Sequence, residues 1–206
     1  MFETVRNAFK IKDLRKKILY TLFILVVVRI GCQLPIPGVD ADYISQWFAD
    51  QNSLDFFNQL TGGSFEKMSI FALNITPYIT SSIILQLLTI AIPRLEELHK
   101  DGEEGRKKIS EYTRYVTIVL SLMESAAMAI GFASQGLLTD GATFTSITVC
   151  IVSMTAGSAL LMWLGEQITE HGVGNGISII LLYNIVSRMP EDVSSLFNKF
   201  VKNAST

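Results

Sequence analysis

Few residues of this chain have the type and spacing that catalysis or metal binding requires. Its two histidines, His99 and His171, have no partner at metal-ligand spacing. Cys32 and Cys150 lie in or beside apolar runs without C-x-x-C spacing, which favours buried free thiols over a disulfide or a metal site. The stretch H-G-V-G-N-G follows no predicted strand, so it indicates a tight turn rather than a nucleotide site. We therefore expect no catalytic residue, no metal and no cofactor.

Glu124 is the one carboxylate inside a long apolar run. A carboxylate within a membrane can couple transport to protons, so half of a secondary transporter is one hypothesis. Ser121, Ser125 and Ala129 form a small-x-x-x-small face around it, which favours the alternative of a carboxyl group hydrogen-bonded to a packed neighbouring helix. An intramembrane protease would need a Ser–His or paired-Asp dyad, and the sequence shows none.

The composition indicates a membrane protein. Of 206 residues, 49% are hydrophobic, and the mean hydropathy is positive, which is unusual for a soluble domain. A basic N-terminus followed by ILYTLFILVVVRIGC could be a secretory signal, but no A-x-A site follows it. Arg29 stands three residues before Cys32, where a lipoprotein signal uses an aliphatic residue. This segment is therefore predicted to be a retained anchor.

Apolar runs of about 20 residues predict five transmembrane helices. The predicted spans are 18–36, 70–92, 115–133, 144–165 and a short one at 174–189. The segments 1–17 and 93–114 hold twelve of the 17 Lys and Arg residues, so both are expected to face the cytoplasm. The connection 166–173 is then a cytoplasmic turn, and the external segments are 37–69, 134–143 and the tail 190–206.

One helical face in the second span and one in the fifth combine aliphatic with polar side chains. These faces are Ile75, Ile79, Ser82 and Gln86 in the second span and Ile177, Leu181, Asn184 and Arg188 in the fifth. Pro77 is expected to remove a hydrogen bond inside the second span. Because lipid penalises such groups, the faces should meet protein or water. Pattern alone favours hydrogen bonds between packed helices over a water path constricted by aliphatic side chains.

Two polar connections carry further candidates. Leu54, Phe57 and Leu60 recur at helical spacing before Gly62 and Gly63, which predicts a short external helix. That helix could fold back toward the membrane or remain an external amphipathic turn.

The charged loop KDGEEGRKK lies between two apolar spans. Such a run is usually a solvated connection, and here it is also a candidate docking surface for a cytosolic partner.

Four stretches in the same order together resemble the SecY family, the channel-forming subunits of the bacterial protein translocon. They are LPIPGVD, FALNITPYITSSIILQLL, KDGEEGRKKISEYTRY and LMWLGEQITEHGVGNGISII. The resemblance runs from Ile18 to Pro190. It implies an all-α membrane protein in the bacterial cytoplasmic membrane, with no enzymatic chemistry. Such a channel would pass unfolded secretory proteins and release membrane proteins sideways into lipid.

The resemblance also assigns roles to residues. It implies an aliphatic pore ring of Ile75, Ile79, Ile177 and Leu181, the last standing where the family would have isoleucine. The segment from about Leu54 to Met68 matches the family's plug, and Ser82 and Gln86 match its lateral gate. Cytoplasmic partner contact is expected at Arg106, Lys107 and Lys108.

The implied partners are the small subunits SecE and SecG, a ribosome or the SecA motor ATPase, signal sequences, nascent or unfolded polypeptide and membrane lipid. Members of the family have about ten spans in two inverted halves, whereas this chain resembles the N-terminal half alone. The C-terminal half of the same channel is therefore a further expected partner, because it would complete the ring and the gate.

Overall fold

The computed structural model describes residues 11–39, 61–136, 138 and 143–197. Helices account for most of this part, which contains no named strand, and the predicted all-helical class is confirmed. The helices are α2 (Lys12–Gly31), α5 (Thr76–Ala91), α6 (Pro93–Lys100), α7 (Glu103–Ser134), α8 (Phe144–His171) and α9 (Gly176–Phe197).

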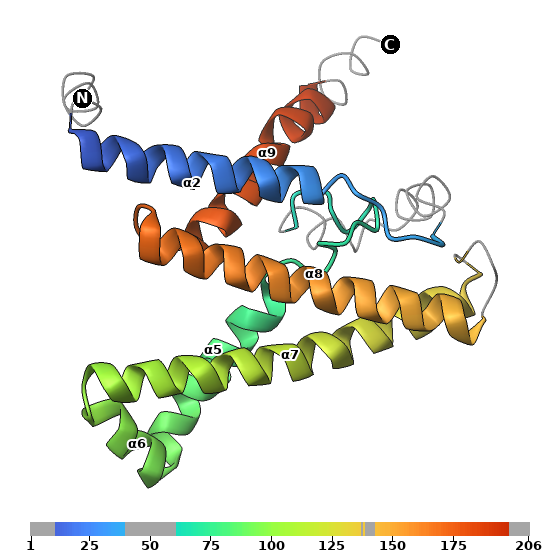
Figure 1. The fold of residues 1–206 in the computed structure, drawn as a ribbon. Coiled ribbons are helices and arrows are strands. Elements are labelled where there is room, and N and C mark those ends of the chain that lie inside the picture. Colours follow the sequence, from blue (N-terminus) through green and yellow to red (C-terminus); the bar gives the residue numbers. More distant parts are fainter. Residues whose placement is uncertain (1–10, 40–60, 137, 139–142, 198–206) are drawn as a thin grey trace.

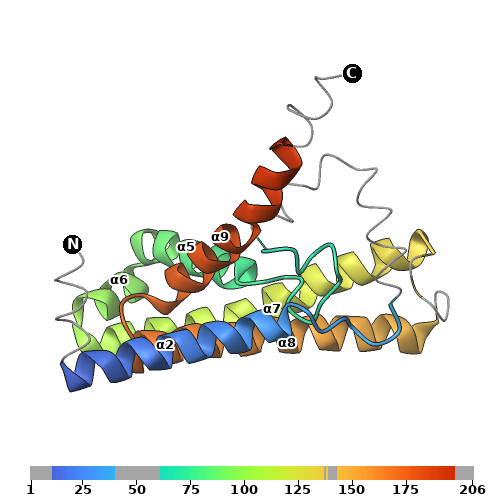
Figure 2. The same ribbon diagram turned by 90° about the horizontal axis from the view of Figure 1, so that it is seen from above.

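Three long helices form one layer. Helix α8 lies between α2 and α7 and packs against both, while α5, α6 and α9 lie on one face of this layer (Figure 1; Figure 2). Helix α5 packs on α7, and α9 packs on α8 and α2. Helix α8 is thus the central element against which the others are placed.

By length and composition, α7 and α8 can each cross a membrane, and α5 with α6 could form a third, broken span. Gly176–Pro190 is a shorter apolar helix. Helix α2 carries five basic residues and ends at Gly31, so its apolar part is shorter than the predicted span 18–36. The structure therefore supports two or three spans in its described part, and the count of five stays a prediction.

Prolines set both ends of α5. Pro77 lies in the first turn of the helix, where no N–H is needed, so the expectation that it removes a hydrogen bond inside a span is wrong. At the other end, Ile92 is extended because Pro93 follows it, and the chain turns by 102° into α6.

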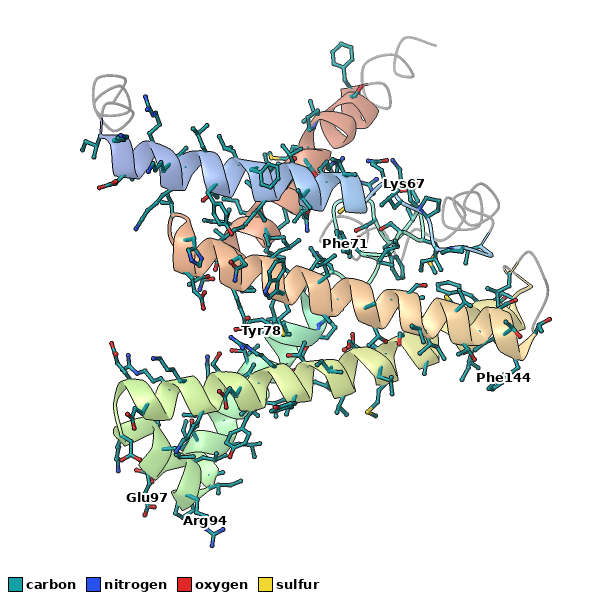
Figure 3. The ribbon with its side chains drawn as sticks, viewed as in Figure 1. Lys67, Phe71, Tyr78, Arg94, Glu97 and Phe144 are labelled. Carbon is teal, nitrogen blue, oxygen red and sulfur yellow. The ribbon has the colours of Figure 1, made fainter. Side chains whose placement is uncertain are left out.

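Residues 61–75 form turns between the C-terminal end of α2 and the start of α5. The backbone N–H of Ile36 donates to the Met68 carbonyl at 2.9 Å, and that of Ile70 donates to the Leu34 carbonyl at 3.0 Å. Phe71 fills the space between α2 and α8, against Gly31 (Figure 3). We call residues 61–75 the turn segment; its residues 70–75 stand where the sequence predicted the start of the helix 70–92.

The small residues predicted to pack against a neighbouring helix lie at the contact between α7 and α8. Ser121, Ser125 and Ala129 are buried, and the hydroxyls of Ser125 and Thr155 are 2.9 Å apart across α7 and α8. The sequence interpretation of this face as a helix contact agrees with the structure. Cys32 and Cys150 are buried and free.

Candidate functional site

An apolar cluster lies where α5 and α9 meet α2 and α8. Ile75 is 1% exposed and belongs to this cluster, and Ile79 and Ile177 are half-buried and pack against it. Leu181 is half-buried and lies outside it. The fold therefore brings together three of the four predicted ring residues, while their role as a ring stays a prediction. The sequence pattern missed Ile180, which is fully buried in this cluster.

The start of α9 is fixed by side chains that accept hydrogen bonds from its first backbone N–H groups. The Asn175 Oδ1 atom accepts hydrogen bonds from the N–H groups of Ile177 and Ser178, at 3.1 and 3.3 Å. The Thr169 hydroxyl of α8 accepts one from the Gly176 N–H at 2.9 Å. The predicted glycine-rich turn thus holds Ile177 in a defined place against α8.

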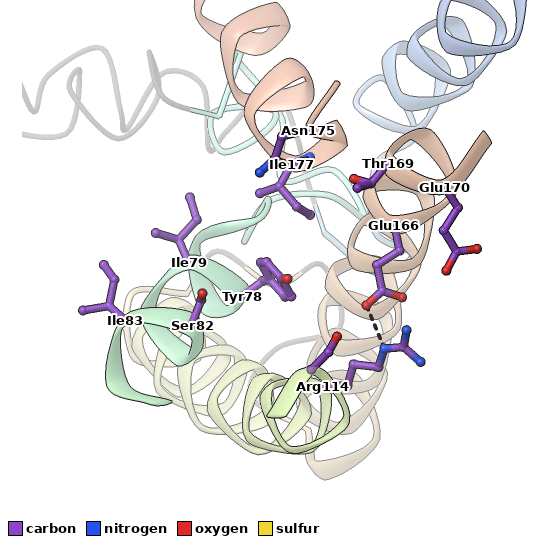
Figure 4. Close-up of a pocket in the computed structure, with 11 residues that line it drawn as sticks. Tyr78, Ile79, Ser82, Ile83, Arg114, Glu166, Thr169, Glu170, Asn175 and Ile177 are labelled. Atoms are coloured by element: carbon purple, nitrogen blue, oxygen red, sulfur yellow. Dashed lines mark hydrogen bonds and ion pairs between the residues drawn. The ribbon is translucent and has the colours of Figure 1, made fainter. Parts of the chain in front are cut away.

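Ile79 and Ile177 line one cavity of about 370 Å³ between α5, α7, α8 and α9. Figure 4 shows these two side chains on the side of α5 and α9, with the polar groups of α7 and α8 across from them. Ser82, Thr169 and Asn175 contribute further polar groups. The cavity therefore combines an aliphatic side with a hydrogen-bonding side.

An ion pair closes the polar side of this cavity. The Arg114 Nε atom of α7 lies 2.7 Å from the Glu166 Oε1 atom of α8 (Figure 4). The two side chains are 44% and 15% exposed, so water screens the pair in part.

We expect Arg114→Ala to lower the free energy of unfolding by about 1 kcal/mol or less, since exposed ion pairs contribute little. Denaturant titration of the purified protein in detergent would measure this. Arg106→Ala is the matched control, because Arg106 lies on the same helix and makes no ion pair among the described residues. A loss of several kcal/mol at Arg114 alone would show that the pair holds the two helices together.

The predicted gate residues line a second cavity of about 240 Å³ between α5, α6 and α7. Gln86 is exposed, and its Nε2 atom lies 3.5 Å from the Ser82 Oγ atom one turn away. Arg106 and His99 line the same cavity. Ser82 also lines the first cavity, so it connects the predicted gate with the predicted ring.

The predicted partner contact residues Arg106, Lys107 and Lys108 are exposed near the start of α7, shortly after α6 ends. Figure 3 shows Arg94 and Glu97 of α6 pointing away from the helical layer. On the same helix, Lys100 donates a 2.6 Å hydrogen bond that holds the pKa of the Glu96 carboxyl below its ordinary value. This surface is charged and accessible.

The polar end of the predicted stripe on α9 meets protein. The Asn184 Nδ2 atom donates a buried hydrogen bond of 3.0 Å to the Asn74 Oδ1 atom, and Arg188 Nη1 lies 3.2 Å from Glu66 Oε2. At this end the structure supports hydrogen bonds between packed elements and not an open water path. The pairing with Asn74 was missed by sequence reasoning. Pro77 signals only that a helix starts near Thr76, which leaves Asn74 outside the helix with a positive φ of 53°.

Glu124 is half-buried on α7 and lines a largely apolar cavity of about 320 Å³ beside the turn segment. Its carboxyl group has no hydrogen bond or ion pair to another described residue. The described part of the chain also contains no group of three or more His, Cys, Asp or Glu residues that could hold a metal ion.

The predicted plug is described only in part. Gly62 and Gly63 are buried and have positive φ values of 66° and 84°, a backbone conformation that favours glycine. Residues 61–68 form turns rather than a helix. Leu54, Phe57 and Leu60 lie outside the described residues, so the plug helix stays a prediction.

Comparisons with known proteins agree on one family. The SecY family model matches residues 69–206. The chain is 43% identical over 200 residues to the protein translocase subunit SecY of Bacillus subtilis, covering 96% of this chain and 46% of that protein. It is also 43% identical over 189 residues to the SecY subunit of Pseudomonas aeruginosa, covering 91% and 42%. The chain thus spans about half the length of the curated relatives it matches.

Solved structures share the fold at lower identity. A structure described as Sec61 in the canine ribosome-channel complex from the endoplasmic reticulum has a TM-score of 0.60 and 19% identity, covering 91% of this chain and 38% of that one. A structure described as a protein conducting channel gives the same values. Since the family model covers most of the chain and includes α5 and α9, which carry the aliphatic cluster, the chain belongs to the SecY family.

Proposed function

We propose that this chain forms one half of a channel that passes unfolded secretory proteins across the bacterial cytoplasmic membrane and releases membrane proteins sideways into lipid. The observation that carries the proposal is that Ile79 of α5 and Ile177 of α9 face one cavity, in a chain of the SecY family. These residues come from segments about a hundred positions apart, so the fold and not the local sequence brings them together. The proposed role is conduction without enzymatic chemistry.

The aliphatic lining suits a passage for unfolded chains. Its side chains offer neither hydrogen bonds nor fixed charge, so polar and apolar segments of a moving polypeptide find no deep binding minimum there. Without a substrate, such a constriction is too dry for ions. In this proposal Ile75, Ile79, Ile177 and Leu181 form half of the ring, and a C-terminal half supplies the rest.

The remaining assignments belong to the same proposal. The segment 54–68 acts as a plug on the external side, and Ser82 and Gln86 lie on the lateral gate through which signal sequences reach lipid. The position of Ser82 in both cavities supports a route from the ring to that gate. The N-terminus faces the cytoplasm in this arrangement, as the distribution of basic residues predicts.

Partners follow from the proposed channel. Exposed Arg106, Lys107 and Lys108 near the start of α7 would face a cytosolic ribosome or the SecA motor. The small subunits SecE and SecG and the C-terminal half would cover apolar surface that the described helices expose, such as Phe23 and Val26 on α2.

The proposal is tested by reconstituting the complete channel, this chain with its C-terminal half, into vesicles with a motor and a preprotein. Protease protection of the preprotein inside the vesicles is the expected result. Failure of every preprotein to enter, with a folded and assembled channel, would overturn the proposed function.

Glu124→Gln distinguishes the channel from a proton-coupled transporter. We expect preprotein entry to stay within about twofold of the unchanged channel, because Glu124 lines an apolar cavity to which none of the four ring residues contributes. Proton-driven uptake of a small solute that disappears on this substitution would instead support a transporter, since proton coupling needs an ionisable group. Glu111→Gln, the same change at an exposed position of α7, is the matched control.

A further inference from the structure

A buried group of polar side chains ties the turn segment to α2 and α9. Asn184 Nδ2 of α9 donates to Asn74 Oδ1 at 3.0 Å, and the two side chains are 1% and 2% exposed. The donor and the acceptor of this hydrogen bond are therefore both shielded from water. A hydrogen bond in the protein interior is stronger than one at the surface.

Two arginines hold the other end of the same segment. Arg29 of α2 donates through Nη1 to the Gly62 carbonyl at 2.9 Å and to the Ser187 hydroxyl of α9 at 3.1 Å. Arg188 of α9 donates through Nη1 to Glu66 at 3.2 Å. These contacts join α2, α9 and the turn segment at one point. We call Arg29, Asn74, Asn184 and Arg188, with the groups they bind, the polar clamp.

The polar clamp lies next to the predicted ring at two places, one before α5 and one on α9. Asn74 immediately precedes Ile75, and Asn184 follows Leu181 by one turn of α9. A shift of Asn74 away from Asn184 would therefore also move Ile75 relative to α9. Gly62 lies against the Asn184 backbone, where a Cβ atom would be 3.1 Å from the Asn184 carbonyl oxygen. Gly62, at the start of the described part of the predicted plug, thus packs closely on Asn184.

The clamp is incompletely satisfied. The Asn184 Oδ1 and Arg188 Nε atoms are buried and have no hydrogen-bond partner in the described part of the chain. Arg188 donates to the Glu66 carboxylate, whereas the described contacts of Arg29 are to a carbonyl and a hydroxyl. A partly satisfied buried network is less stable than a fully satisfied one. Moving the turn segment away from α2 and α9 therefore costs less free energy than the loss of the clamp's hydrogen bonds alone would suggest.

We propose that the polar clamp is a releasable latch that holds the turn segment against α2 and α9 in the resting channel and so keeps the aliphatic ring closed. Asn74 and Asn184 are positioning residues in this proposal, acting through Ile75 and Gly62. It rests on the proposed function, because only a channel has a resting state to keep closed.

The test is a double-mutant cycle in the complete channel, this chain with its C-terminal half, in planar bilayers. Asn74→Gly deletes the amide and keeps the positive φ, which glycine adopts readily. Asn184→Ala deletes the donor. We expect each to raise the ion leak of the resting channel about fivefold, the population shift that one net buried hydrogen bond supplies, and the double variant to leak no more than either one.

Controls separate the latch from general destabilisation and from the proposed function. Ser178→Ala on α9 removes an exposed hydroxyl outside the clamp and should leave the leak unchanged. Preprotein entry, measured on the same preparations, should persist in all variants. If the unchanged channel passes no preprotein, the proposed function fails independently of the latch.

Unchanged leak in both single variants, or a leak that adds fully in the double variant, would overturn the latch. Should Asn184→Ala fail to fold, Ser187→Ala supplies the second measurement, because it removes only the hydroxyl that accepts from Arg29. A smaller rise in leak is then expected, and no rise would contradict the proposal.

Discussion

A channel carrying Ile79→Asn together with Ile177→Asn should leak ions at rest by at least about tenfold more than the unchanged channel, equivalent to about 1.4 kcal/mol in the barrier. The two side chains face one cavity from α5 and α9. An amide at each position would give water hydrogen-bonding partners inside a constriction that aliphatic groups keep dry. Single-channel conductance of the complete channel in planar bilayers would measure the effect.

The matched control changes two aliphatic residues of the same helices that are exposed in this chain. Leu87 of α5 is 62% exposed and Leu182 of α9 is 61% exposed. Leu87→Asn with Leu182→Asn introduces the same groups and should leave the resting conductance unchanged. If the cavity pair and the control pair leak alike, or if neither leaks, the assignment of Ile79 and Ile177 to a ring is wrong.

The second large effect is expected at Gly157 of α8, where the helix meets the turn segment. A Cβ atom at this position would collide with the Ile70 backbone carbonyl, which cannot move aside as a flexible side chain would. We expect Gly157→Leu to lower the free energy of unfolding by about 3 kcal/mol, because overpacking at a backbone contact forces the two elements apart. Thermal or denaturant unfolding in detergent would measure the loss.

Gly131 of α7 provides the comparison for Gly157. It also lies inside a long helix, but a Cβ atom there meets nothing within 4 Å. Gly131→Leu should therefore leave stability unchanged or raise it slightly, since glycine is a poor helix former. Equal losses at both glycines would show that the contact with Ile70 does not determine the packing of α8.

The sequence predicted those features that depend on local pattern. Long apolar runs predicted α7 and α8, and the small-residue spacing of Ser121, Ser125 and Ala129 predicted the contact of α7 with α8. Helical periodicity also selected Ile79 and Ile177, which the fold places on one cavity. In each case neighbouring residues in the chain carry the information.

Features that depend on distant segments were not predictable in the same way. Periodicity extended the second span back to residue 70 because FALNI is apolar, yet tertiary contacts hold these residues in turns. The Ile70 N–H donates a hydrogen bond to the Leu34 carbonyl after α2, and the Phe71 side chain fills a gap beside Gly31. The partner of Asn184 lies 110 residues away, so no local spacing could identify it.

The central place of α8 has a consequence for biosynthesis. Helix α2 is synthesised before the helices against which it packs, α8 and α9. Until Phe144–His171 has been synthesised, α2 has neither of these two helical neighbours. Lipid or another protein therefore surrounds the face of α2 that later packs on α8 and α9, and that packing begins only when the fourth apolar run has been made.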